Sequence, residues 1–161
     1  MLCVFEDAVK KRYASFTASL SRLLQDPETN IKSKALSILY NLLTRFPEGE
    51  RTLLTLLVNT LGDPVKKIAS RAIYFLQTLL SEHPTMVTVV VKEVQQLLFR
   101  PNIKLRAQAY AITFLTQIEF NSRMQDVASR LVALYFDFFK VRNTEVERER
   151  LSQGSRVRVR D

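Results

Sequence analysis

Three prolines that recur at equal intervals constrain the fold of this chain more than any other feature. Pro27, Pro64 and Pro101 are spaced 37 residues apart. Apolar residues before each proline repeat at the same interval and lie four residues apart within each copy, as on one face of a helix. The three repeating series are Phe16, Leu53, Val90 and Val127; Leu20, Leu57, Val94 and Leu131; and Leu24, Leu61, Leu98 and Tyr135.

A second periodic segment follows each proline. Its apolar residues are three or four positions apart, which again indicates a helix. Each unit is therefore predicted to be a helix A, a turn, a helix B and a second turn. Ala35, Leu36, Leu39, Leu42, Leu43 and Pro47 recur as Ala72, Ile73, Leu76, Leu79, Leu80 and Pro84, and a third copy, shifted by one more residue, contains Tyr110, Ala111, Phe114 and Ile118.

The turn into each B helix carries start signals. Proline is tolerated in the first turn of a helix, because the N–H that it lacks would have no partner there. Asp26 and Asp63 stand directly before a proline and are predicted to be N-caps. In the third unit Arg100 cannot cap a helix, and Asn102 is expected to substitute for it.

These patterns predict an all-α fold. One hairpin cannot bury its own apolar face, so neighbouring hairpins must stack, and we expect a HEAT/armadillo-like α-solenoid of about three and a half hairpins with a 37-residue repeat. The helical-repeat domain is predicted over 1–141. A charged basic tail over 142–161 is expected to be either a solvated helical extension or a disordered arm. Helices are predicted near residues 3–25, 30–46, 50–61, 65–82, 85–99, 103–119 and 123–141.

The run from Met86 to Val91 has the composition of a β-strand. We nevertheless predict a helix, because Val90, Val94 and Leu98 stand where the other A helices have their core positions. Helical periodicity is here expected to prevail over local strand propensity.

Core and end positions also follow from the repeat. Leu39, Leu76 and Phe114 occupy equivalent positions on the B helices and are predicted to be buried. The terminal A helices, near residues 5–24 and 127–138, have no polar caps and are expected to expose apolar surface, which usually marks an interface. A stack with such ends is expected to be a fragment or a truncated isoform of a longer protein.

Residue sets that would support catalysis are missing from the sequence. There is one histidine, so no two-histidine zinc site can form, and His83 at a helix end is predicted to be structural. Cys3 is the only cysteine, which excludes an internal disulfide, favours a reducing compartment and disfavours a nucleophile. The three glycines are isolated, so there is no phosphate-binding loop. We predict a protein that is not an enzyme and has no cofactor, metal or small-molecule substrate.

No membrane association is expected either. Glu6 and Asp7 interrupt the apolar residues at the N-terminus, which argues against a signal peptide. No stretch approaches the roughly 18 apolar residues that a membrane helix needs.

The net charge of +8 favours a polyanionic partner, RNA above all, although a solubilising charge would have the same sign. Basic residues recur at the start of each B helix, and stacking would align them along one edge. Our hypothesis is that this edge and the tail contact RNA phosphates, and the alternative is a solvated edge whose charges pair with nearby acids. The candidate RNA-binding residues are Lys32, Lys34, Lys66, Lys67, Arg71, Lys104, Arg106, Arg156, Arg158 and Arg160.

Five short elements between Leu61 and Gln117 resemble one family in their order and spacing. They are LGDP at 61–64, the pair His83–Pro84, VVVKEV at 89–94, FRPN at 99–102 and RAQAYA at 106–111. The chain is similar here to the nucleolar-complex, or CCAAT-binding-factor, family of ribosome assembly factors. This resemblance implies a helical-repeat scaffold of the nucleus and nucleolus that helps to assemble the large ribosomal subunit. It also implies two partners, a second helical-repeat nucleolar protein and pre-ribosomal RNA.

A second function stays open beside this one. A generic HEAT-type adaptor would bind protein cargo or peptides and would not need RNA. Sedimentation with pre-ribosomal particles that changes after nuclease treatment would distinguish the assembly factor from the adaptor.

Overall fold

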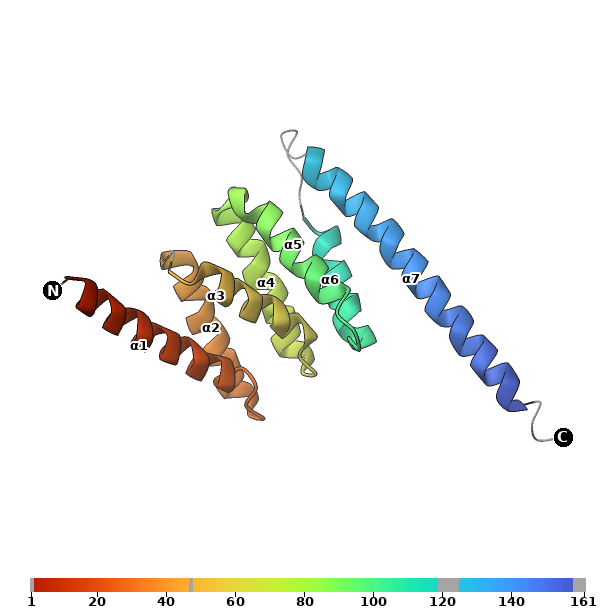
Figure 1. Cartoon of the computed structure of the whole chain (residues 1–161), viewed down its shortest axis with the longest axis horizontal. Coiled ribbons are helices and arrows are strands. Elements are labelled where there is room, and N and C mark those ends of the chain that lie inside the picture. Colours follow the sequence, from red (N-terminus) through yellow and green to blue (C-terminus); the bar gives the residue numbers. More distant parts are fainter. Residues whose placement is uncertain (1, 47, 119–124, 158–161) are drawn as a thin grey trace. The chain divides into compact units, whose positions relative to one another are not determined.

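The computed structural model describes residues 2–46, 48–118 and 125–157. Within these ranges every regular element is helical, which confirms the all-α prediction (Figure 1). Residues up to Ile118 form one compact unit, and α7 belongs to a second. The elements in chain order are α1 (Leu2–Leu23), α2 (Thr29–Arg45), α3 (Glu50–Asn59), the 3₁₀ helix η1 (Thr60–Gly62), α4 (Lys66–Glu82), the 3₁₀ helix η2 (Pro84–Met86), α5 (Val87–Leu98), α6 (Leu105–Thr116) and α7 (Gln125–Val157).

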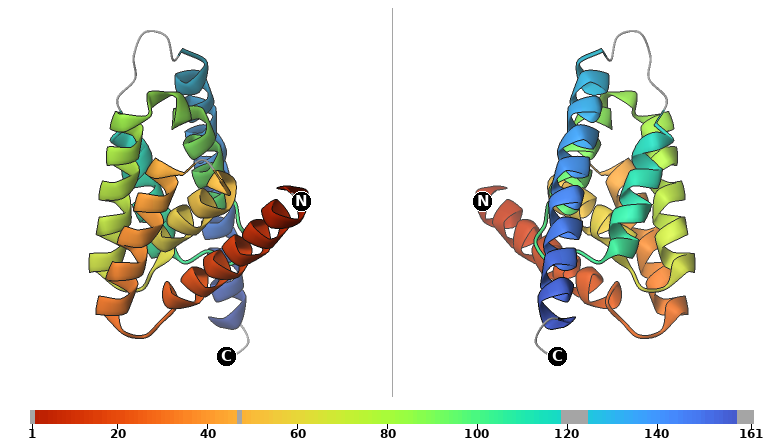
Figure 2. Two further views of the ribbon diagram at one scale, coloured as in Figure 1. Left: turned by 90° about the vertical axis from the view of Figure 1, so that its left-hand side faces the viewer. Right: turned by 90° about the vertical axis from the view of Figure 1, so that its right-hand side faces the viewer.

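The helices of the first unit lie in two layers. The layer of α2, α4 and α6, here called the B helices, faces the layer that holds α3 and α5, as Figure 2 shows. The A helices are α1, α3 and α5, and α1 packs against α2. Helices α2 and α4 begin 37 residues apart, at 29 and 66, as do α3 and α5, at 50 and 87. Helix α6 begins 39 residues after α4, at 105, which is two residues beyond the 37-residue interval, whereas the apolar pattern of the third copy is shifted by one.

The core lies between the two layers. Leu39, Leu76 and Phe114 are each 0% exposed, which confirms their predicted inward positions on the B helices. Leu57 and Val94, at the middle position of the A-helix series, are equally inaccessible. Facing apolar stripes at helical spacing therefore form one continuous core along the stack.

The strand-like valine run is helical, as predicted. Met86 ends η2, and α5 begins at Val87. Val87, Val90, Val91 and Val94 are all buried, at the spacing of one helix face. The burial of four valines outweighs the few tenths of a kcal/mol per residue by which a β-branched side chain disfavours a helix.

The predicted N-caps are wrong. Asp63 Oδ1 accepts a hydrogen bond from the N–H of Val65 at 2.8 Å, and α4 begins only at Lys66. Asp26 does the same for Glu28 before α2. Each aspartate therefore accepts a hydrogen bond from the N–H two residues later and closes a local turn. The proline that follows the aspartate lies within this turn, ahead of the helix.

The predicted N-cap of the third hairpin is wrong as well. Asn102 has a φ of 61°, a left-handed conformation that asparagine tolerates better than most residues, and it lies in the turn. The N-cap position of α6 is Lys104, whose side chain makes no capping hydrogen bond. Asn102 is therefore not the cap that the sequence indicated.

Phe16 does not face the core as its place in the repeat predicts. It is 46% exposed, and the buried position is taken by Thr17, whose hydroxyl bonds to the carbonyls of Tyr13 and Ala14. Helix α1 stands at the end of the first unit and packs against α2, so its outer side has no described helix of that unit against it. Pro47 lies outside the described residues.

The exposed apolar surface expected on α1 is present. Phe5, Val9, Phe16 and Leu23 are between 42% and 70% exposed. At 3.6 residues per turn they fall within roughly 40° of arc on one side of the helix. These four residues are called the α1 stripe below.

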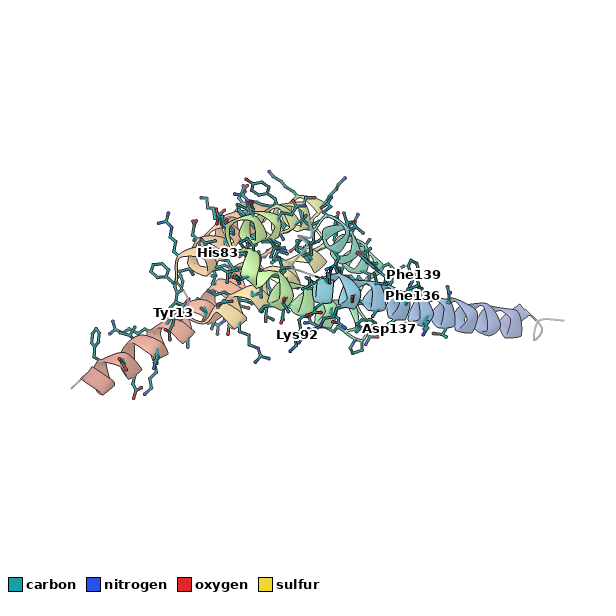
Figure 3. The ribbon with its side chains drawn as sticks, turned by 90° about the horizontal axis from the view of Figure 1, so that it is seen from above. Tyr13, His83, Lys92, Phe136, Asp137 and Phe139 are labelled. Atoms are coloured by element: carbon teal, nitrogen blue, oxygen red, sulfur yellow. The ribbon has the colours of Figure 1, made fainter. Side chains whose placement is uncertain are left out.

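Helix α7 forms the described part of the second unit. It continues past residue 141 to Val157, so the described part of the tail is helical. Phe136 and Phe139 project from α7 and are largely exposed (Figure 3). The domain boundary at residue 141 stays a prediction.

No described helix is both long enough and apolar enough to cross a membrane.

The core assignment predicts a large decrease in stability for Leu76→Ala. Truncating a buried leucine costs roughly 2–5 kcal/mol in the free energy of unfolding, because the removed atoms no longer pack against apolar neighbours and a cavity remains. Urea denaturation followed by circular dichroism measures this decrease. Ser70→Ala, on the exposed face of the same helix, is the control and should change stability by less than about 0.5 kcal/mol. A decrease that small for Leu76→Ala would mean that the inward face is misassigned.

The α1 stripe predicts that the chain associates with itself when it has no other partner. Sedimentation velocity over a concentration series should show a mass that rises with concentration, because exposed apolar patches drive association. Phe5→Gln combined with Phe16→Gln should shift the chain toward monomer. Lys10→Gln combined with Lys11→Gln, on the charged side of α1, should leave association unchanged. A parent chain that stays monomeric at every concentration would contradict this prediction.

Candidate nucleic-acid interface

The charges of the central hairpins are divided unequally between the two layers. The sequences of α3 and α5 are balanced, each with one acidic and one basic residue. The B helices contain one acid, Glu82, at the end of α4, and the N-cap residue of α2, Glu28, adds a second. Their basic residues, together with the N-cap residue of α6, are Lys32, Lys34, Arg45, Lys66, Lys67, Arg71, Lys104 and Arg106. The positive charge is therefore concentrated on the B-helix side.

Five exposed cations form what we call the basic edge: Lys34, Lys66, Lys67, Lys104 and Arg106. They come from the N-terminal halves of the B helices, which begin at the same end of the layer (Figure 1). Among the described side chains, none of the four lysines lies within ion-pair distance of an acid. Arg106 donates a hydrogen bond to the carbonyl of Pro64 at 3.1 Å and links α6 to the turn before α4.

Lys32 does not belong to this edge, contrary to the sequence-based hypothesis. Its ammonium group lies 2.6 Å from Asp63 Oδ2, and the two side chains are only 9% and 7% exposed. A charge buried this deeply needs a partner, and Asp63, from the turn before α4, supplies it. Lys32 therefore links the first and second B helices and cannot reach a phosphate in solvent.

Arg71 is only partly available to bind an RNA phosphate. Its guanidinium group donates hydrogen bonds to the hydroxyls of Ser33 and Ser37 on α2 and lies 5.4 Å above the Phe75 ring. Ser33 and Ser37 are one helical turn apart, so the fork of Arg71 spans that turn. Its first role is to hold α2 and α4 side by side.

An aromatic cluster lies beside Arg71. Tyr40 of α2 stacks on Phe75 of α4 with ring centroids 4.6 Å apart and planes 10° from parallel. Tyr40 donates a hydrogen bond to Glu82 at 2.9 Å. Burial, and then this hydrogen bond, raise the pKa of Tyr40 to about 12. Tyr74 lies next to Phe75, with centroids 5.8 Å apart, and is 62% exposed.

The arginines of the tail stay predictions. Arg156 lies within α7, but its side chain is outside the part of the chain described in detail. Arg158 and Arg160 lie beyond the described residues.

Metal-binding clusters are not found in the described residues. These residues hold no group of three or more histidine, cysteine or acidic side chains that could bind a metal ion. His83 is exposed at the C-terminal end of α4, as Figure 3 shows.

Sequence reasoning did not identify Tyr74 or the residues that link the hairpins. Tyr74 occurs in a run of aromatic and aliphatic residues, IYFLQTLL, where a core role is the default. A helical projection gives a usable signal: Tyr74 follows Lys67 by seven residues and so falls on the polar side of α4.

Comparison with known proteins adds an independent observation. The family model of the non-SMC mitotic condensation complex subunit 1, Cnd1, matches residues 6–152. The human protein CCAAT/enhancer-binding protein zeta (Homo sapiens) is 42% identical over 94% of the chain. Nucleolar complex protein 1 of Drosophila melanogaster is 41% identical over 85%, and ribosome biogenesis protein NOC1 of Chaetomium thermophilum is 39% identical over 86%. The chain spans only 15%, 12% and 13% of the lengths of these relatives, respectively.

The buried ion pair predicts that two neighbouring lysines respond very differently to the same substitution. Lys32→Met should lower the free energy of unfolding by about 3–5 kcal/mol, because it leaves the Asp63 charge buried without a partner. Lys34→Met, two residues away and exposed, should change it by less than about 0.5 kcal/mol. Both are measured by urea denaturation.

A double-mutant cycle isolates the pair. Asp63→Asn keeps an oxygen for the Val65 N–H but removes the charge. Added to Lys32→Met, it should recover part of the stability, so that the double variant is less destabilised than the sum of the single variants. Strict additivity would show that the two charges do not interact in the folded protein.

Proposed function

Because the chain belongs to the Cnd1 family and is a homologue of nucleolar complex protein 1 and CCAAT/enhancer-binding protein zeta, we propose that it is a non-catalytic scaffold of ribosome assembly. Its place of action is the nucleus, in particular the nucleolus. The names of two relatives, a nucleolar complex protein and a ribosome biogenesis protein, support this assignment. The particle that it helps to assemble is the large ribosomal subunit.

The architecture of this scaffold is a HEAT/armadillo-like solenoid with a repeat of 37 residues and about three and a half hairpins. The equal spacing of the starts of α2 and α4, and of α3 and α5, supports it. So do the hydrogen bonds between adjacent hairpins, which join residues roughly one repeat apart, such as Thr55 to Glu93 and Gln77 to Gln117. Stacked units of this kind present long surfaces to large partners.

The protein partner is a second helical-repeat protein of the nucleolus. The α1 stripe supplies an apolar surface of the kind that packs against another helix. Burying it against a partner would extend the same layer packing that joins the hairpins of this chain. The partner therefore needs an amphipathic helix at the end of its own stack.

The second partner is pre-ribosomal RNA, held by its phosphates at the basic edge without sequence readout. The observation that carries this part is the set of four exposed lysines that have no acidic partner among the described residues. Phosphate contacts of this type fix position and contribute affinity, and they do not distinguish bases.

A generic adaptor for protein cargo or peptides is the second candidate function. The α1 stripe favours it, because an apolar helix face needs no nucleic acid to find a partner. The two functions differ in their dependence on RNA. In a pull-down from nuclear extract, an assembly factor should recover pre-ribosomal particles, and nuclease treatment should reduce their recovery. Recovery of proteins alone, unchanged by nuclease, would favour the adaptor.

Charge reversal tests the RNA interaction directly. Lys66, Lys67 and Lys104 are changed to glutamate; Arg71 is left intact because it links α2 and α4. RNA binding should weaken alike for unrelated sequences. The slope of log affinity against log salt should fall by roughly 0.7 for each single-stranded phosphate that the variant no longer neutralises. Fluorescence anisotropy over a salt series measures both quantities.

The matched control has the same change in net charge. Lys10, Lys11 and Arg12 of α1 are also exposed, and their reversal to glutamate lies outside the basic edge. It should weaken RNA binding much less. Equal effects of the two triple variants would mean that only net charge matters, and an unchanged affinity in both would rule out RNA binding by the basic edge.

A further inference from the structure

Tyr74 presents an aromatic ring to solvent on the middle B helix. It is 62% exposed, the largest exposed fraction among the aromatic residues of the first unit apart from Phe5. Burying a tyrosine ring is favourable, so an isolated ring on a polar helix face contributes little to the fold. Its position, between the basic edge and the aromatic cluster, calls for a role outside the core.

The ring of Tyr74 has a firm support. It contacts Phe75 at a tilt of 50°, and Phe75 is itself buried, stacked on Tyr40 and covered by the guanidinium group of Arg71. A flat partner that packs on Tyr74 would therefore lie beside a ring cluster whose other members are held by packing.

Cations of the basic edge lie close enough to the Tyr74 ring for one RNA segment to contact both. Lys67 precedes Tyr74 by seven residues on α4, so the two project from the same side of the helix, about 10.5 Å apart along its axis. Lys34 lies on the neighbouring helix, next to Ser33, to which Arg71 is bonded. A phosphate at the basic edge and a base at the ring would thus be separated by a span that one nucleotide and two side chains can bridge.

Acidic residues are fewer than basic ones on this face. Glu28 is exposed at the N-cap of α2, and Glu82, at the far end of α4, accepts the hydrogen bond of Tyr40. On the A-helix side Lys92 and Glu93 neighbour each other, and Figure 3 shows Lys92 projecting from that side. The field on the B-helix side is therefore the more positive of the two.

We propose that the B-helix face binds an unpaired segment of RNA, with a base stacked on Tyr74 and phosphates held by Lys34, Lys67 and Lys104. The proposal rests on the RNA binding of the proposed function and names the form of RNA that is bound. In a duplex the bases are stacked on each other and hidden from a helical surface, whereas a single strand can turn a base outward. Positive surface combined with exposed aromatic rings is the usual arrangement for binding single strands.

The chemistry of the face favours RNA over an acidic protein. The lysines of the basic edge do not decide between the two, because an ammonium group pairs with phosphate and with carboxylate alike. A carboxylate partner, however, would leave the Tyr74 ring without a flat surface to pack on. The Tyr74 ring is thus the feature of this face that favours RNA over an acidic protein.

Anisotropy titrations with three labelled probes test the proposal: a 15-nucleotide oligouridine, a 15-base-pair RNA duplex and a 15-residue polyglutamate peptide. The oligouridine should bind most tightly. Tyr74→Ala should weaken its binding roughly 5- to 150-fold, the range that follows from removing one base–aromatic stack. Tyr74→Phe keeps a stacking ring and should stay close to the parent. Ile38→Ala, an exposed apolar truncation on α2, should have little effect.

The salt dependence separates stacking from charge. Tyr74→Ala leaves every phosphate-binding cation in place, so the slope of log affinity against log salt should stay that of the parent, although the affinity falls. Reversal of Lys66, Lys67 and Lys104 should change the slope. Circular dichroism of each variant confirms that the helices are intact.

Each contrary outcome has a distinct meaning. Equal affinity for duplex and oligouridine, or a Tyr74→Ala variant that binds oligouridine as the parent does, would overturn this proposal and leave the RNA binding of the proposed function standing. Failure to bind either RNA would overturn both. Tighter binding of polyglutamate than of RNA would assign the face to an acidic protein and would also overturn the proposal.

Discussion

The structure depends on the packing of one layer of helices against the other. A single hairpin of this size leaves its apolar stripe open to water, so each unit is stable only against its neighbours. Leu39, Leu76 and Phe114 are fully buried because a helix of the other layer faces each of them. At either end of such a stack this cover is missing, and the exposed α1 stripe is the direct result.

Polar links fix the alignment of neighbouring hairpins, which apolar packing alone specifies weakly. Lys32 with Asp63 and Arg71 with Ser33 join α2 to the second hairpin, and Gln77 of α4 donates to Gln117 at the end of α6. Buried or partly buried polar groups must find partners, so a slip of one helical turn would leave several of them unsatisfied. The links also explain why Arg71 and Lys32 serve the fold although they stand in a basic run.

Short-range periodicity was enough to predict the helices and most of the core, as the valine run at 87–91 illustrates. The wrong predictions concern side chains whose burial depends on a residue far away in the sequence or on a position at the end of the stack. Lys32 is buried because of Asp63, 31 residues away, and Phe16 is exposed because the outer side of α1 has no described helix of the first unit against it. For the same reason the sequence could not separate cations that link hairpins from those that face solvent. Tyr74 was not singled out, because it stands in a run of apolar and aromatic residues where a core role is the default.

The contrast between Lys32 and Lys34 gives the strongest physical argument for an external partner of the B-helix face. The fold holds Lys32 by pairing it with a buried carboxylate, so this architecture can neutralise a lysine where the structure requires it. Lys34, Lys66 and Lys67 receive no such partner among the described residues. Lys66 and Lys67 stand in the first turn of α4, where positive charge opposes the helix dipole by a few tenths of a kcal/mol. Lysines that oppose the dipole of α4 and have no acidic partner in the described part of the fold are what the proposed contact of the basic edge with RNA phosphates would neutralise.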